Sequence, residues 1–226
     1  MWRNYCHQWH AGLLLLVFVW PASAICAIAA APIDSPEAAR AAMAEFLRRS
    51  GKSADQYIIS CPGPSGLLTK TYVASVSEKG NFIPAPPPRY LILRDGGIVP
   101  LDFLDLEPLV IAYRKEGIAV SGDRKVETIA RSLIRLGDVC GPVEISSVKD
   151  IPGYEKRPLD ADLEAVVRAP WKFTDKEGNV YWICTTYTQN GGVVRRYKFV
   201  FGRGLIGNPV DVIQLGRAIG DVFYPE

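Results

Sequence analysis

Hydrophobic residues recur with helical spacing in two stretches of the chain. The first stretch, residues 36–49, follows Ser35, which is suited to cap a helix, and it starts with Pro36 and stops before Gly51. Its apolar positions are Ala39, Met43, Phe46 and Leu47. The second stretch follows Asp123 as the expected cap and ends at Gly137. Its apolar positions are Val126, Ile129, Ala130, Leu133, Ile134 and Leu136. Both patterns predict helices that bury one side.

Most other segments alternate between apolar and polar residues, as strands do. QYIIS, LLTKTYVASVS and RYLILRDGGIV read as extended segments, with Asp95-Gly96 suited to a two-residue hairpin turn. Three further runs, AVVRAPWKFTD, NVYWICTTYT and VVRRYKFVFG, predict a three-stranded meander. Residues 101–120 fit either a strand or a helix, and Asn208-Pro209 predicts a short C-terminal helix. The predicted fold class is α+β, a predominantly antiparallel sheet with two main helices packed on it.

The turn QNGG sets the pairing within this meander. If Asn190 and Gly191 occupy the two turn positions, Trp182 pairs with Phe199 and Cys184 with Tyr197. One face then carries Val180, Trp182, Cys184, Tyr197, Phe199 and Phe201. We expect that apolar face to be buried. The opposite face is mixed, and its Tyr181, Tyr187, Arg196 and Lys198 are the candidate binding residues, since tyrosines beside cations hold anions, sugars or peptide backbones.

The first thirty residues have the layout of a secretory signal peptide. Arg3 precedes the apolar run AGLLLLVFVWPASAICAIAA, which ends in small residues. The expected organisation is a signal peptide over residues 1–29, cleaved after Ala24 or Ala29, and a single exported domain over residues 30–226. That domain has two possible sub-halves meeting near residues 117–123. The alternatives are an uncleaved membrane anchor and a lipid-modified Cys26. Contact with a membrane is expected only through an uncleaved N-terminal segment.

Export to the periplasm or outside the cell favours disulfide bonding of the remaining cysteines. Cys61, Cys140 and Cys184 follow the signal, and we expect a bond between Cys140 and Cys184. Cys184 lies on the predicted core face, and Cys140 follows a helix expected to cover the same sheet. The alternatives are a bond from Cys61 to either residue and a buried, reduced Cys184.

The histidine content excludes several enzyme classes. The two histidines, His7 and His10, both lie in the predicted signal peptide. The mature chain would therefore lack His-dependent triads and histidine metal ligands, and it has no C-x-x-C spacing. No metal site and no cofactor are predicted. With 26 Lys+Arg against 24 Asp+Glu, the chain also has no charge excess typical of nucleic-acid binding.

Carboxylates are the remaining candidates for catalysis. They form two clusters, LDFLDLE and LDADLEA. The candidate residues are Asp102, Asp105, Glu107, Asp160, Asp162 and Glu164. Two facing carboxylates hydrolyse glycosidic bonds without histidine. The expected function is nonetheless a non-catalytic binding domain for a protein or small ligand of the cell envelope. The alternatives are a carboxylate-dependent hydrolase of envelope glycans and a structural subunit of an envelope assembly.

Overall fold

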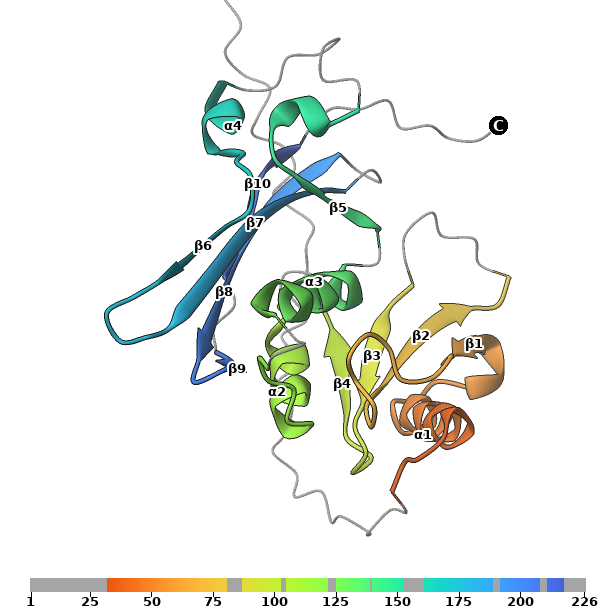
Figure 1. Ribbon diagram of the computed structural model, residues 1–226. Coiled ribbons are helices and arrows are strands. Elements are labelled where there is room, and N and C mark those ends of the chain that lie inside the picture. Colours follow the sequence, from red (N-terminus) through yellow and green to blue (C-terminus); the bar gives the residue numbers. More distant parts are fainter. Residues whose placement is uncertain are drawn as a thin grey trace, which may run out of the picture. The chain divides into compact units, whose positions relative to one another are not determined.

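Two antiparallel sheets and four α-helices make up the described part of the fold (Figure 1). The computed structural model describes residues 32–80, 87–102, 105–121, 125–138, 140–152, 161–188, 192–207 and 211–217, with the backbone alone for 161–163 and 216–217. These residues belong to one compact unit. The predicted signal peptide, His7, His10 and Cys26 lie outside the described residues.

The N-terminal sheet has four strands in chain order, β1-β2-β3-β4. The strands are β1 (Tyr57–Ser60), β2 (Tyr72–Glu78), β3 (Arg89–Ile92) and β4 (Ile98–Leu101). A short 3₁₀ helix, η1 (Ala54–Gln56), leads into β1. The β3–β4 turn differs from the two-residue prediction, because Ile92 pairs with Ile98 and Leu93 donates its amide to the Gly97 carbonyl at 2.8 Å. Three residues therefore form this loop, and its Gly96 has φ 85°.

The C-terminal sheet has the order β10-β8-β7-β5, with β6 also on β7 and β9 also on β8. Its strands are β5 (Pro142–Ile145), β6 (Trp171–Thr174), β7 (Val180–Thr188), β8 (Val193–Gly202), β9 (Leu205–Ile206) and β10 (Asp211–Arg217). The predicted meander β6-β7-β8 is confirmed. The predicted register is confirmed as well, since Trp182 pairs with Phe199 and Cys184 with Tyr197.

The helices are α1 (Pro36–Arg49), α2 (Glu107–Lys115), α3 (Val126–Gly137) and α4 (Ala161–Val166), and a 3₁₀ turn η2 (Val148–Asp150) follows β5. The Ser35 cap of α1 is confirmed, because its Oγ accepts the Ala38 amide at 3.1 Å. All six predicted apolar positions of α3 are buried. The expected cap Asp123 lies outside the described residues, and Lys125 stands at the N-cap position without a side-chain capping bond.

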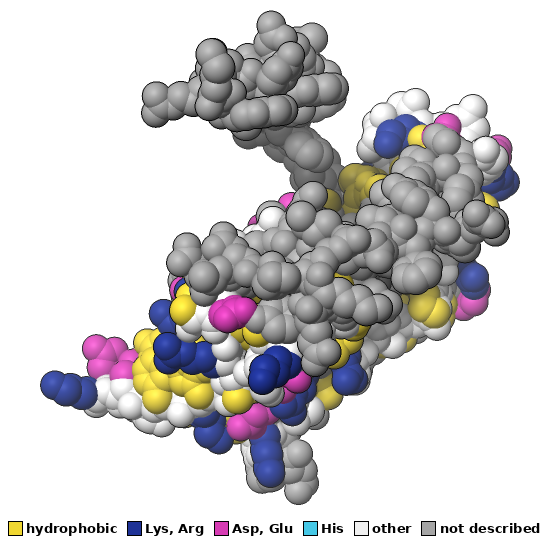
Figure 2. Space-filling model, turned by 90° about the horizontal axis from the view of Figure 1, so that it is seen from above, with side chains coloured by type: hydrophobic (Ala, Val, Ile, Leu, Met, Phe, Trp, Pro, Cys, Tyr) yellow, Lys and Arg dark blue, Asp and Glu magenta, His cyan; other side chains and the backbone are white. Residues whose placement is uncertain are grey.

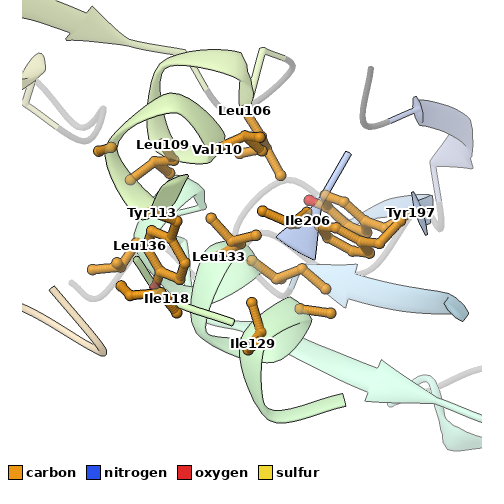
Figure 3. Packing of buried hydrophobic residues seen from close by; sticks show 14 of the residues in the cluster. Leu106, Leu109, Val110, Tyr113, Ile118, Ile129, Leu133, Leu136, Tyr197 and Ile206 are labelled. Atoms are coloured by element: carbon orange, nitrogen blue, oxygen red, sulfur yellow. The ribbon is translucent and has the colours of Figure 1, made fainter. Parts of the chain in front are cut away.

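Hydrophobic packing joins these elements in layers. Helix α1 packs on one face of the N-terminal sheet through Ala39, Met43 and Leu47. The largest cluster combines Val73 and Leu91 from the other face of that sheet with α2, α3 and one face of the C-terminal sheet. Figure 3 shows side chains of α2 and α3, such as Val110 and Leu133, in one cluster with Tyr197 and Ile206. Helices α2 and α3 thus share one core with both sheets.

The structure settles one segment that the sequence left open and corrects another. Residues 107–115 of the ambiguous segment form α2, and β4 (98–101) precedes that helix. The predicted C-terminal helix is wrong over residues 211–217, which form β10 on the edge of β8. An edge strand leaves a row of unpaired backbone groups, and the β-branched Val212 and Ile213 suit a strand on that edge. Asn208 and Pro209 lie outside the described residues.

Candidate functional site

The outer face of the C-terminal sheet, which carries the odd-numbered residues of β7, is the candidate binding surface. Cross-strand pairing places Phe173, Tyr181 and Val200 in one row of this face. The next row holds Trp171, Ile183, Lys198 and Asp211. The third holds Thr185, Arg196 and Ile213. Near the β6–β7 hairpin, which points to the left in Figure 1, Figure 2 shows exposed hydrophobic side chains beside Lys and Arg.

A stacked aromatic pair lies next to an ammonium group in the first rows of this surface. The rings of Phe173 and Tyr181 lie 4.7 Å apart and 6° from parallel, and the Lys198 Nζ lies 5.4 Å from the Tyr181 ring centre. Lys198 also pairs with the Asp211 carboxylate at 3.7 Å. Burial and a hydrogen bond to Asp175 raise the pKa of Tyr181, so its hydroxyl stays protonated. The surface therefore combines a rigid aromatic platform with a compensated charge.

The predicted binding residues differ in their exposure to solvent along this face. Tyr181 and Arg196 are half-buried and Lys198 is exposed, so all three reach solvent. Tyr187 is 4% exposed and packs in a small cluster with Ile145, Val148, Ile151, Val167 and Val194. Its place on the surface was wrongly predicted, because the segment after β5 covers this end of the face. Exposed Phe173 and Ile213 were not predicted, although alternation along β6 would have placed Phe173 here.

The inner face of the same sheet contains a buried ion pair. Arg195 Nη1 lies 2.5 Å from Asp138 Oδ2, and both side chains are more than nine-tenths buried. Thr188 donates its hydroxyl to the same oxygen at 3.1 Å, and the Cys140 amide donates to Oδ1 at 3.0 Å. A second guanidinium, that of Arg89, donates to the Leu136 carbonyl. Burial lowers the pKa of Arg89, and the nearby Asp138 charge acts in the opposite direction. These contacts tie the end of α3 to β7 and β8.

Sequence reasoning missed this cluster although a signal for it exists. The confirmed register puts Arg195 on the same face as Tyr197 and Phe199. An arginine on a buried face requires an acidic partner, since an unpaired buried charge is strongly unfavourable. The partner Asp138 is 57 positions away in the chain, which no local pattern reveals.

The predicted Cys140–Cys184 disulfide is not formed. Cys61, Cys140 and Cys184 are all free thiols in the structure. Cys140 lies at the Asp138 cluster beside Thr188, four residues beyond Cys184 on β7, which corresponds to about 13 Å along a strand. A disulfide needs Cα atoms within about 7 Å. Burial raises the pKa of the Cys184 thiol strongly, which makes it a core side chain rather than a nucleophile.

The predicted catalytic carboxylates fall on two separate stretches. Asp102 and Asp105 precede α2 and Glu107 begins it; all three are exposed. Asp105 Oδ1 accepts the Glu107 amide at 2.9 Å, a local turn bond just before α2. Glu164 is exposed on α4, while Asp160 and the side chain of Asp162 lie outside the described residues. Catalysis by these carboxylates stays a prediction.

Comparison with known proteins gives no match to this chain, whether with protein families, curated proteins or solved structures. No helix in the described ranges is long and apolar enough to cross a membrane. Among the same residues, no group of three or more His, Cys, Asp or Glu side chains has a metal-binding arrangement.

Proposed function

We propose that this protein is a non-catalytic binding domain that recognises a protein of the cell envelope through the outer face of its C-terminal sheet. The observation that carries the proposal is the exposure of large hydrophobic side chains on one face of the sheet. Phe173 is 44% exposed and lies beside the half-buried Tyr181, and Ile213, which is 46% exposed, lies two rows away on the same face. Exposed aromatic side chains surrounded by polar residues are common in protein-interaction sites.

The chemistry of the surface favours an apolar partner surface over a highly charged one. Stacked Phe173 and Tyr181 are held by each other, so little side-chain entropy is lost when a partner covers them. Aromatic side chains of this kind commonly dominate interface energetics. Lys198 already has Asp211 as a counter-ion, so it contributes to the rim and to orientation.

The envelope location rests on the signal peptide predicted over residues 1–29. It is tested by mass spectrometry of the protein purified from its own cells. A mature chain that begins after Ala24 or Ala29 supports export. A soluble chain that retains His7 and His10 contradicts it.

The surface itself is tested by site-specific photo-crosslinking in the native cells. A photoreactive phenylalanine analogue is placed at position 173, at 213, or at the control position 58. Ile58 is 56% exposed but lies on β1 of the other sheet. We expect one adduct shared by positions 173 and 213 and absent from position 58. The replacement Ile213→Asp should abolish the adduct at position 173 without lowering the melting temperature.

Three outcomes would contradict the proposal. The first is that positions 173 and 213 give no adduct. The second is that position 58 gives the same adducts. The third is that the crosslinked partner is a second copy of this chain. The last outcome favours the alternative of a self-assembling structural subunit.

A further inference from the structure

The strand β6 lies at the margin of the outer face and has one side without a strand partner. Within the described part of the chain it pairs with β7 alone, and no other strand lies along its far side (Figure 1). An unpaired strand edge presents backbone N–H and C=O groups that another extended chain can bond. Lys172, Phe173 and Thr174 are all exposed, so a partner has access to this strand.

The turn between β6 and β7 fixes which backbone groups point to the free side. The Asp175 amide donates to the Asn179 carbonyl at 3.0 Å, so these two residues form a hydrogen-bonded pair. Bonded and non-bonded pairs alternate along an antiparallel ladder. Phe173 therefore belongs to the next bonded pair, and Lys172 and Thr174 belong to non-bonded pairs. The N–H and C=O groups of Lys172 and Thr174 point away from β7 and form the free edge.

The side chains of β6 leave the outer side of this edge apolar. Phe173 points to the outer face, where its ring stacks on Tyr181 at 4.7 Å. Lys172 points to the inner side, where its Nζ lies 3.1 Å from Glu127 Oε1 of α3. Charged side chains on edge strands commonly prevent the addition of another strand. Here the charge is paired on the inner side, so a strand added beside β6 would meet Phe173 on the outer side.

Other edge strands of the described sheets contain features that hinder strand addition. The strand β4 contains Pro100 and β5 begins with Pro142, and proline lacks the amide hydrogen that a ladder bond requires. The strand β10 has a register shift between Gln214 and Gly216. The strand β6 has neither a proline nor a register shift. The edge strand β1 also lacks both, but it belongs to the other sheet.

We propose that the envelope partner adds an extended segment of its own chain to the free side of β6. This mode of binding rests on the proposed function, because the segment would lie beside the outer face. Backbone hydrogen bonds to Lys172 and Thr174 would hold it, and an apolar side chain of the segment would lie opposite Phe173. The positions of the segment that bond β6 would not be proline.

The length of the edge favours a segment over a second copy of this chain. The strand β6 has four residues, which corresponds to about 13 Å of extended chain. Stable interfaces between folded proteins typically bury about 1,200–2,000 Å² in total, far more than a pairing of two such short strands provides. An extended segment needs no matching globular surface around the edge, because its backbone supplies the bonds and its alternate side chains reach the outer face.

The geometry of strand addition is tested by mapping photo-crosslinks in the native cells. A photoreactive phenylalanine analogue replaces Trp171 or Phe173, which lie two positions apart on the outer side of β6. Mass spectrometry of the crosslinked peptides locates the attachment points in the partner. We expect both probes to attach within one contiguous stretch, about two positions apart, because residues on one face of a strand repeat every two positions. Attachment to separate segments of the partner would overturn strand addition and leave binding by the outer face intact.

A proline variant tests the backbone bonds directly. Thr174→Pro removes an N–H group that points to the free side, so it should lower the yield of the adduct at position 173 about tenfold. The fold should persist, because proline is tolerated on an edge strand where its nitrogen faces solvent. The matched variant Thr174→Val keeps the N–H group and should keep the adduct. If Thr174→Pro fails to fold, the crosslink map decides, because it uses chains that retain Thr174.

The outcomes separate strand addition from the proposed function. An undiminished adduct at position 173 in folded Thr174→Pro would overturn strand addition alone. The absence of any adduct in the chain with Thr174 would overturn the proposed function and strand addition with it.

Discussion

Replacing Asp138 with asparagine tests the role of the buried ion pair in stability. Asparagine keeps the size of the side chain, and its Oδ1 still accepts the Cys140 amide, which lies 3.0 Å from Oδ1 in the wild-type protein. The oxygen that contacts Arg195 at 2.5 Å and Thr188 at 3.1 Å becomes an NH₂ group. The new NH₂ group, a donor, then faces the Arg195 guanidinium, which is also only a donor, in a region that water does not reach. Arg195 is left buried without its counter-ion.

We expect Asp138→Asn to lower the free energy of unfolding by about 3–5 kcal/mol, the usual cost of removing one partner of a buried pair. Arg89 adds to the effect, since its guanidinium is also partly buried near Asp138 and burial already lowers its pKa. Total stabilities of 5–15 kcal/mol are typical, so about a third of the stability or more would be lost.

The assay is urea unfolding followed by the fluorescence of tryptophan, because Trp182 is 2% exposed and reports loss of the core. The matched control is Asp95→Asn, which alters an exposed pair with Lys115 at 3.8 Å and should change stability by less than about 1 kcal/mol. Adding Arg195→Met to Asp138→Asn should recover about 1–3 kcal/mol relative to additivity. A loss below about 1 kcal/mol, or strict additivity in the double variant, would refute the reasoning.

Three further predictions concern single side chains. Cys184 should resist iodoacetamide in the native protein, and Cys140 should react slowly at neutral pH and faster as the pH rises, because burial raises the pKa of both thiols. Mass spectrometry of alkylated peptides checks this, and rapid labelling of Cys184 would contradict it. Burial raises the pKa of Tyr197 to about 12, so its contribution to stability is complete below the unfolded pKa of about 10 and is lost as the pH rises toward 12. The free energy of unfolding, measured by urea titration at a series of pH values, should show this decline, and Tyr197→Phe should flatten it. Gly137→Ala should lower the free energy of unfolding by about 1–3 kcal/mol although alanine favours helices, because the added Cβ would clash with Leu106 Cδ2 in the core. An unchanged or higher melting temperature would show that Leu106 moves aside.

Local chemistry made the hairpin and the helices predictable. The period of a strand is two residues and the β7–β8 turn sets the register, so the pairing of Cys184 with Tyr197 followed from the sequence. The buried side of α3 followed from the 3.6-residue period in the same way. For the same reason Tyr181 and Lys198 were correctly placed on one face of the sheet.

Tertiary packing decided what local patterns leave open. Tyr187 shares the outer face with Tyr181, yet Val148 and Ile151 from the segment after β5 pack against it and remove it from the surface. Residues 211–217 became a strand because β8 has an edge to pair, whereas the local signal favoured a helix.

The buried ion pair likewise depends on contacts between distant segments. Asp138 follows α3, Thr188 comes from β7 and Arg195 from β8, and no spacing in the sequence indicates that they meet. The sequence by itself determined which side chains share a face, because that depends only on the repeat of each element. The tertiary structure decided which faces are covered and which polar groups meet, because both depend on packing between residues far apart in the chain.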